Sequence, residues 1–107
     1  MPTLLGALKV SDVPPGAMKL IKAGDSEVVV ANVGGEFCAF GNICPHEGGP
    51  LAEGELDGDE VVCPWHYTRF DVRTGVAIEG VTDEPIPVYA TRIDGDQILV
   101  EGTEGAG

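Results

Sequence analysis

Two pairs of cysteine and histidine stand close together in the chain, in an arrangement typical of a metal site. Cys44-Pro45-His46 contains the first pair and Cys63-Pro64-Trp65-His66 the second, with sixteen residues between His46 and Cys63. Each pair offers a metal both a soft thiolate and an imidazole. Structural zinc fingers usually take two cysteines from one unit and two histidines from another. The mixed pairs therefore favour a two-iron cluster to which each loop gives one ligand per iron, with a Cys2His2 zinc domain as the alternative.

The segments that must position these pairs have the pattern of short β-strands. Gly34-Gly35, Asp57-Gly58 and Asp94-Gly95 read as hairpin turns, because glycine accepts positive φ. No segment has a sustained 3.6-residue apolar period, so helix is limited to a turn near Ser11–Pro15. The pattern predicts an all-β fold of antiparallel sheets, a sandwich or barrel. The expected strands are Leu4–Val10, Met18–Ala23, Glu27–Val33, Glu36–Gly41, Glu60–Cys63, Arg69–Val72, Ile86–Arg92 and Gln97–Glu101.

The length of 107 residues predicts a single domain, residues 1–107. Residues 42–80 differ from the flanks, because they hold both Cys/His pairs among many loop-forming glycines and prolines. We expect this segment to be a small cluster-binding subdomain, inserted into a β base that the two ends of the chain build.

The charge is strongly acidic, with six Lys plus Arg against eighteen Asp plus Glu. Between Lys22 and Arg69 the chain has nine acidic residues and no basic one. Such a field repels nucleic acid and anionic membranes and steers the protein toward basic protein surfaces. The sequence contains no long apolar run, so no membrane span is predicted, and the N-terminus lacks the features of a signal peptide. Three cysteines, an odd number, argue against a disulfide framework and indicate a cytoplasmic protein.

The two pairs, their spacer and the following Phe70-Asp71-Val72-Arg73-Thr74-Gly75 resemble the Rieske family of [2Fe-2S] proteins, in particular its ferredoxin branch. The resemblance implies a Rieske-like fold and a Rieske-type [2Fe-2S] cluster as cofactor. It further implies that Cys44 and Cys63 bind the inner iron, and that His46 and His66 bind the outer iron.

Positions that are not ligands separate the branches of this family. High-potential members join the two ligand loops by a disulfide, where this chain has Gly49 and Trp65, and use two hydroxyls near the sulfurs, where it has Thr68 and Phe70. Phe70 cannot donate a hydrogen bond to reduced sulfur. We therefore expect a potential at the low end of the Rieske range, about −150 mV.

Catalysis by the chain itself is not expected. Its only two histidines are both claimed as ligands, which leaves none for acid–base work or for a mononuclear iron site. Of the remaining candidates, Cys38 reads as a buried apolar residue and Trp65 as a hydrophobic lid.

The resemblance implies a monomeric one-electron carrier of a bacterial aromatic-ring hydroxylating dioxygenase system. The carrier would pass electrons from an NAD(P)H-dependent flavin reductase to a terminal oxygenase, through the edges of His46 and His66, in transient complexes steered by charge. The alternative is a Rieske-like small subunit of a larger oxidoreductase such as nitrite reductase. The sequence does not identify the oxygenase, its substrate or the reductase.

Overall fold

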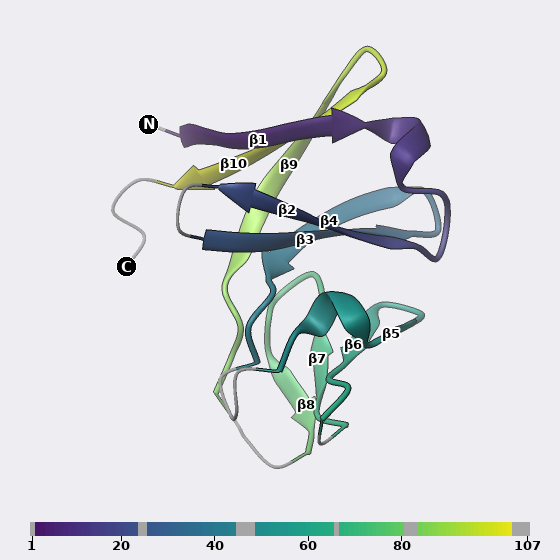
Figure 1. Cartoon of the computed structure of the whole chain (residues 1–107), viewed down its shortest axis with the longest axis vertical. Coiled ribbons are helices and arrows are strands. Elements are labelled where there is room, and N and C mark those ends of the chain that lie inside the picture. The colour runs from purple at the N-terminus through teal and green to yellow at the C-terminus, as the bar shows by residue number, and fades with distance from the viewer. Residues whose placement is uncertain (1, 24–25, 45–48, 66, 81–83, 104–107) are drawn as a thin grey trace.

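The computed structural model describes residues 2–23, 26–44, 49–65, 67–80 and 84–103. Within these ranges, antiparallel strands form a large sheet of six strands and a small sheet of four. Figure 1 shows the large sheet above the small sheet, with the segment that leads into β9 running up from the small-sheet region. The expected all-β architecture is confirmed.

The large sheet has the strand order β1-β10-β9-β4-β3-β2. A 3-10 turn, η1 at Val10–Asp12, falls where the only helical turn was predicted. Gly34, Gly35 and Gly95 have positive φ, as the hairpin turns require. The strands are β1 Pro2–Lys9, β2 Met18–Ala23, β3 Ser26–Val33, β4 Glu36–Gly41, β9 Val88–Asp94 and β10 Gln97–Thr103.

Strand β3, which lies between β4 and β2, is buried on both faces, and the residues on its two faces belong to two different apolar clusters. Val28 and Val30 face one of these, the base cluster, whereas Val29 and Ala31 face the other, the shared cluster, because side chains alternate along a strand. The shared cluster comprises Val29, Ala31, Cys38, Phe40, Cys44, Leu51, Val61, Cys63, Phe70, Val72 and Ile86. The base cluster comprises Leu8, Val13, Val28, Val30, Ala39, Ile98 and Val100. It lies wholly within the large-sheet region.

The small sheet has the order β5-β6-β7-β8, and every strand has three residues: β5 Glu55–Asp57, β6 Glu60–Val62, β7 Arg69–Asp71 and β8 Ala77–Glu79. The strand register aligns one apolar row across the sheet, formed by Leu56, Val61, Phe70 and Ala77. A 3-10 turn, η2 at Leu51–Glu53, precedes β5. The small sheet lies within the range predicted for a subdomain.

The sequence prediction missed β5, β8 and η2, and placed one strand start too early. Three residues are too few for an alternating pattern, and both strands include acidic residues, since β5 is Glu-Leu-Asp and β8 is Ala-Ile-Glu. The strand expected from Ile86 begins at Val88, because the Ile86 N–H donates to the Gly75 carbonyl at 2.8 Å instead.

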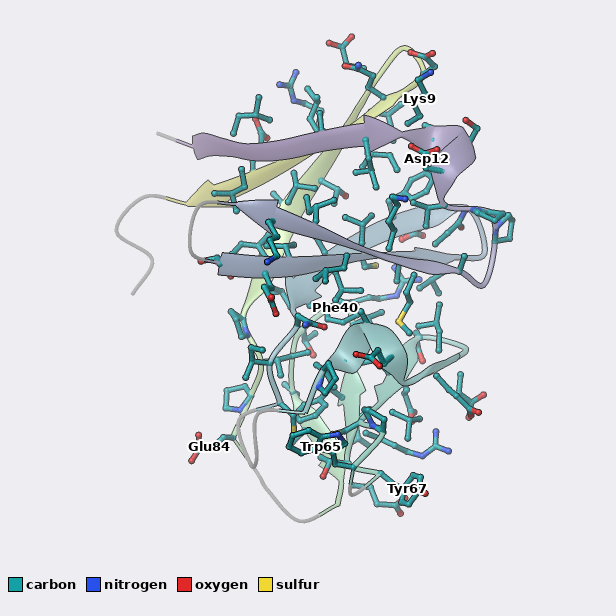
Figure 2. The ribbon with its side chains drawn as sticks, viewed as in Figure 1. Lys9, Asp12, Phe40, Trp65, Tyr67 and Glu84 are labelled. Atoms are coloured by element: carbon teal, nitrogen blue, oxygen red, sulfur yellow. The ribbon has the colours of Figure 1, made fainter. Side chains whose placement is uncertain are left out.

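The shared cluster joins the two sheets. It contains Phe40 of β4 together with Leu51, Phe70 and both motif cysteines, Cys44 and Cys63. Figure 2 shows Phe40 between the large and small sheets. Among the described residues, no helix is long and apolar enough to cross a membrane.

Candidate metal centre

Two of the four predicted ligands lie in the described part of the chain, and both are buried. Cys44 and Cys63 are each 2% exposed and belong to the shared cluster. No disulfide joins any of the three cysteines. His46 and His66 lie outside the described residues. The structure thus brings the two thiols to the core between the sheets.

The first ligand loop, residues 43–50, is closed by backbone hydrogen bonds. The Cys44 N–H donates to the Gly49 carbonyl at 2.9 Å. Ile43 and Pro50 form an isolated antiparallel bridge one residue further out. The loop therefore starts and ends as a narrow hairpin, which fixes the backbone of Cys44.

The second ligand loop is a tight turn after β6. The Cys63 N–H donates to the Thr68 carbonyl at 2.9 Å, and the Tyr67 N–H donates to the Cys63 carbonyl at 3.0 Å. Tyr67 has a φ of 60°, the left-handed region that residues other than glycine rarely adopt. The turn thus holds Cys63 and sends the Tyr67 side chain outward, where it is 71% exposed.

Gly49 provides the close approach between the two loops. A Cβ at this position would lie 3.0 Å from Cys63 Sγ and 3.2 Å from the ring of Trp65. Gly49 and Trp65, which stand where high-potential members of the family have a disulfide, are therefore neighbours here, and the Trp65 indole lies against Gly49. Trp65 covers this point and is 53% exposed. Figure 2 shows it in the lower part of the molecule.

Thr68 and Phe70 are both fully buried beside this turn. A Cβ on Gly80, which has a φ of 136°, would lie 2.5 Å from Thr68 Oγ1. Only glycine fits at position 80. The backbone of Gly80, directly after β8, therefore lies against Thr68 of the second loop.

The acidic run beside the site is partly neutralised by one arginine. Arg69 Nη1 donates to Asp57 at 2.9 Å and to Glu60 at 3.2 Å, and these hydrogen bonds raise the pKa of its guanidinium. Glu53 and Glu55 are exposed and line a cavity of about 220 Å³ that reaches Cys63. The surface near Cys63 therefore remains acidic.

Cys38 has the properties of a packing residue. It lies on β4 in the shared cluster, and burial raises the pKa of its thiol. A neutral thiol in apolar surroundings is a weak nucleophile. The prediction that Cys38 is a buried apolar residue is confirmed.

The donor set fits a thiolate-bound metal. A thiolate buried in an apolar cluster is costly unless a cation compensates its charge. Cys44 and Cys63 lie in such surroundings, at the closed ends of two short loops, and Gly49 leaves Cys63 Sγ approachable. Among the described residues no group of three or more metal-binding side chains occurs, and the predicted histidine ligands fall in the gaps.

Comparison with known proteins agrees with this interpretation. The model of the Rieske [2Fe-2S] domain family matches residues 4–90. The chain therefore belongs to the Rieske [2Fe-2S] domain family, whose cofactor is a Rieske-type [2Fe-2S] cluster.

Individual relatives match over nearly their whole length. The chain is 39% identical over 105 residues to the biphenyl dioxygenase ferredoxin subunit of Pseudomonas sp. (strain KKS102), covering 97% of this chain and 96% of the relative. The ferredoxin-sized chain in a complex of reduced oxygenase and oxidized ferredoxin in carbazole 1,9a-dioxygenase matches with a TM-score of 0.86 and 29% identity, covering 98% of this chain and 100% of that chain. A putative NADH-dependent nitrite reductase small subunit from Mycobacterium tuberculosis has a TM-score of 0.85 at 22% identity, covering 96% and 97%, which shows a common fold.

Sequence reasoning missed two residues near Cys44 and Cys63. Tyr67 occupies a left-handed position where glycine would be expected, and Asn42 is a buried polar residue before the first loop. A polar residue directly after the apolar strand β4 could have suggested a loop-closing role for Asn42.

Proposed function

We propose that this chain is a one-electron carrier that links an NAD(P)H-dependent flavin reductase to a terminal Rieske oxygenase. Cys44, His46, Cys63 and His66 would hold the cluster, which supplies a one-electron couple when bound. The observation that carries the proposal is that Cys44 and Cys63 are deeply buried, whereas Trp65 and Tyr67, close to Cys63 in the chain, are exposed. Such an arrangement shields the metal from water but leaves little protein between it and a partner.

The described surface near the ligands suits brief docking. Tyr67 follows His66 in the sequence, Trp65 precedes it, and both side chains are exposed at the lower end in Figure 2. Exposed acidic residues at Glu53 and Glu55 adjoin the same turn. Aromatic groups supply contact area, and the acidic groups would attract basic patches on both partners.

The relatives named as ferredoxin components of dioxygenase systems support the carrier role and the absence of catalysis by the chain itself. We propose that this chain likewise serves aromatic hydrocarbon catabolism in the cytoplasm, as a monomer. Its odd number of cysteines suits a reducing compartment.

A reconstituted electron-transfer assay tests the proposal. Purified protein is mixed with a panel of flavin reductases, NAD(P)H and candidate oxygenases, and product formation is followed. We expect turnover that depends on this protein and that slows as salt is raised, because screening weakens attraction between opposite surface charges. Turnover that is independent of salt would overturn the steering, and the absence of transfer with every pair would overturn the role.

The nitrite reductase alternative is separated by size-exclusion chromatography of the native protein. The similarity to that small subunit concerns the fold. A permanent subunit would co-purify with a large partner, whereas the carrier is expected to elute at the size of its own 107-residue chain.

A further inference from the structure

Asn42 is a buried polar residue at the junction between the two sheets. It follows Gly41, the last residue of β4, and is 3% exposed. Cys44 stands two residues further along the chain. A buried amide is costly unless its donors and acceptors are satisfied, so the partners of Asn42 define its role.

The partners of Asn42 lie on two different elements. Its backbone N–H donates to the Glu27 carbonyl at 3.0 Å, and its side-chain Nδ2 donates to Glu27 Oε1 at 2.9 Å. Its backbone carbonyl accepts from the Leu51 N–H at 2.7 Å, and its side-chain Oδ1 accepts from the Ala52 N–H at 2.8 Å. The residue therefore ties β3 of the large sheet to η2 of the small-sheet region.

The two tied segments flank the first ligand loop, residues 43–50. Leu51 and Ala52 begin η2, where the first N–H groups of a helical turn lack partners within the turn. Asn42 satisfies both of these N–H groups, and so holds the far end of the loop beside its start. Backbone bonds at this site are available to any residue, whereas the two side-chain bonds need a group that both donates and accepts.

We propose that Asn42 is a positioning residue for the first ligand loop, because its side chain fixes where Cys44 stands relative to the large sheet. The proposal rests on ligation of the cluster by Cys44, which the iron content of the unaltered protein tests separately. Asparagine suits the position because its amide donates to the Glu27 carboxylate and accepts from the Ala52 N–H. An aspartate would keep the acceptor but would face the Glu27 carboxylate with like charge.

The large sheet contains a matched control in Asn32, which is 4% exposed. Its Nδ2 donates to the Val13 carbonyl at 2.8 Å, and its Oδ1 accepts from the Gly35 N–H at 2.8 Å. The number and length of its side-chain bonds thus resemble those of Asn42. The bonds of Asn32 close turns of the large sheet and touch neither ligand loop.

The test has two readouts on the holoprotein. The rate of cluster loss is monitored as bleaching of the visible absorbance, and the surroundings of the cluster are monitored by visible circular dichroism. We expect Asn42→Asp to speed cluster loss by about tenfold or more, the usual effect of removing a group that supports a metal ligand. We expect the circular dichroism to change as well. Asn32→Asp should leave both readouts near those of the unaltered protein, even where it lowers thermal stability.

A double variant that restores the hydrogen bond between positions 42 and 27, with donor and acceptor exchanged, sharpens the test. In the double variant Asn42→Asp with Glu27→Gln, the amide introduced at position 27 can donate to the new carboxylate, which still accepts from the Ala52 N–H. We expect the rate of cluster loss to return to within about threefold of the unaltered protein, since the lost hydrogen bond is replaced. Glu27→Gln alone retains an acceptor for Asn42 and should change the rate little.

Several outcomes would overturn the proposal. Cluster loss from Asn42→Asp that is no faster than from Asn32→Asp would make the residue merely structural, and so would a double variant that shows no recovery. Where Asn42→Asp alone fails to accumulate, recovery of folded, coloured double variant supports the proposal, and its failure overturns it.

Discussion

Strands of six to eight residues build the large sheet, whereas every strand of the small sheet has three. The large sheet has an apolar cluster of its own, while the small sheet shares its cluster with the large sheet and with both cysteines. Short strands bury little area and make few ladder bonds. We propose that the large sheet is stabilised by burial in a cluster of its own, whereas the small sheet depends on the shared cluster and on the predicted metal ligation.

Removing a ligand should give the largest effect and should act on one region. Cys63→Ser is expected to lose the cluster and to increase amide exchange in β5–β8 by on the order of 100-fold, since metal binding stabilises the fold around it. Exchange in β2 and β3 should change much less. Hydrogen-exchange mass spectrometry measures both regions.

Cys38→Ser is the matched control for that experiment, because Cys38 is also buried in the shared cluster but is not a predicted ligand. It should keep the iron content of the unaltered protein. Equal loss of protection in both sheets of Cys63→Ser would contradict the contrast between the regions.

Truncation of one side chain in each cluster should separate stability from metal retention. Phe70→Ala in the shared cluster and Ile98→Ala in the base cluster remove fully buried side chains. We expect losses in the free energy of unfolding of about 3–5 kcal/mol and about 2–5 kcal/mol, respectively. Urea denaturation of the holoprotein measures them.

Only Phe70→Ala should also speed bleaching of the cluster, since Phe70 shares its cluster with Cys44 and Cys63. Equal bleaching in the Ile98→Ala variant would show that metal retention follows global stability instead.

Alanine substitutions at two glycines of the small-sheet region should lower the free energy of unfolding by different amounts, according to the space around each glycine. A Cβ on Gly54 would lie 1.9 Å from the Val62 carbonyl oxygen, whereas one on Gly58 would meet nothing within 4 Å. Gly54→Ala is expected to cost about 1–3 kcal/mol, because the backbone must shift. Gly58→Ala should cost about 1 kcal/mol, for its left-handed φ of 64° alone.

Equilibrium unfolding in urea compares these two variants. An equal cost would mean that the approach of Gly54 to β6 is not a constraint on the small sheet.

The smallest effect is expected at Cys38. Burial raises the pKa of its thiol, so at pH 8 less thiolate is present than for an exposed cysteine, and the reaction with iodoacetamide should be slow. The rate should rise as pH increases. Mass spectrometry of the intact holoprotein measures labelling, and rapid labelling at pH 8 would contradict the burial of this thiol.

The strands with an apolar run between turn signals were predictable from the sequence. Segments such as β3 and β4 contain several apolar residues between turn signals, and each appears where expected. The three-residue strands β5 and β8 were missed because each offers too few side chains for a period, and tertiary pairing decides their state.

The two Cys/His pairs stand out in the sequence because metal binding restricts both residue type and spacing, and their role as ligands stays a prediction, since the structure describes Cys44 and Cys63 but not His46 and His66. The residues that support the two loops could not be predicted from the sequence. Asn42 acts through partners on β3 and η2, one of them fifteen positions away, and no local pattern reports such a pairing. The left-handed backbone of Tyr67 likewise depends on the turn around it and not on its own preference.

The central claim is that this chain carries a low-potential, one-electron [2Fe-2S] cluster. A reductive titration followed by visible absorbance, with iron and sulfide analysis of the same sample, tests it most directly. We predict about two irons and two sulfides per chain, uptake of about one electron, and a midpoint of about −150 mV. A colourless protein that contains zinc, or a midpoint above zero, would contradict the account.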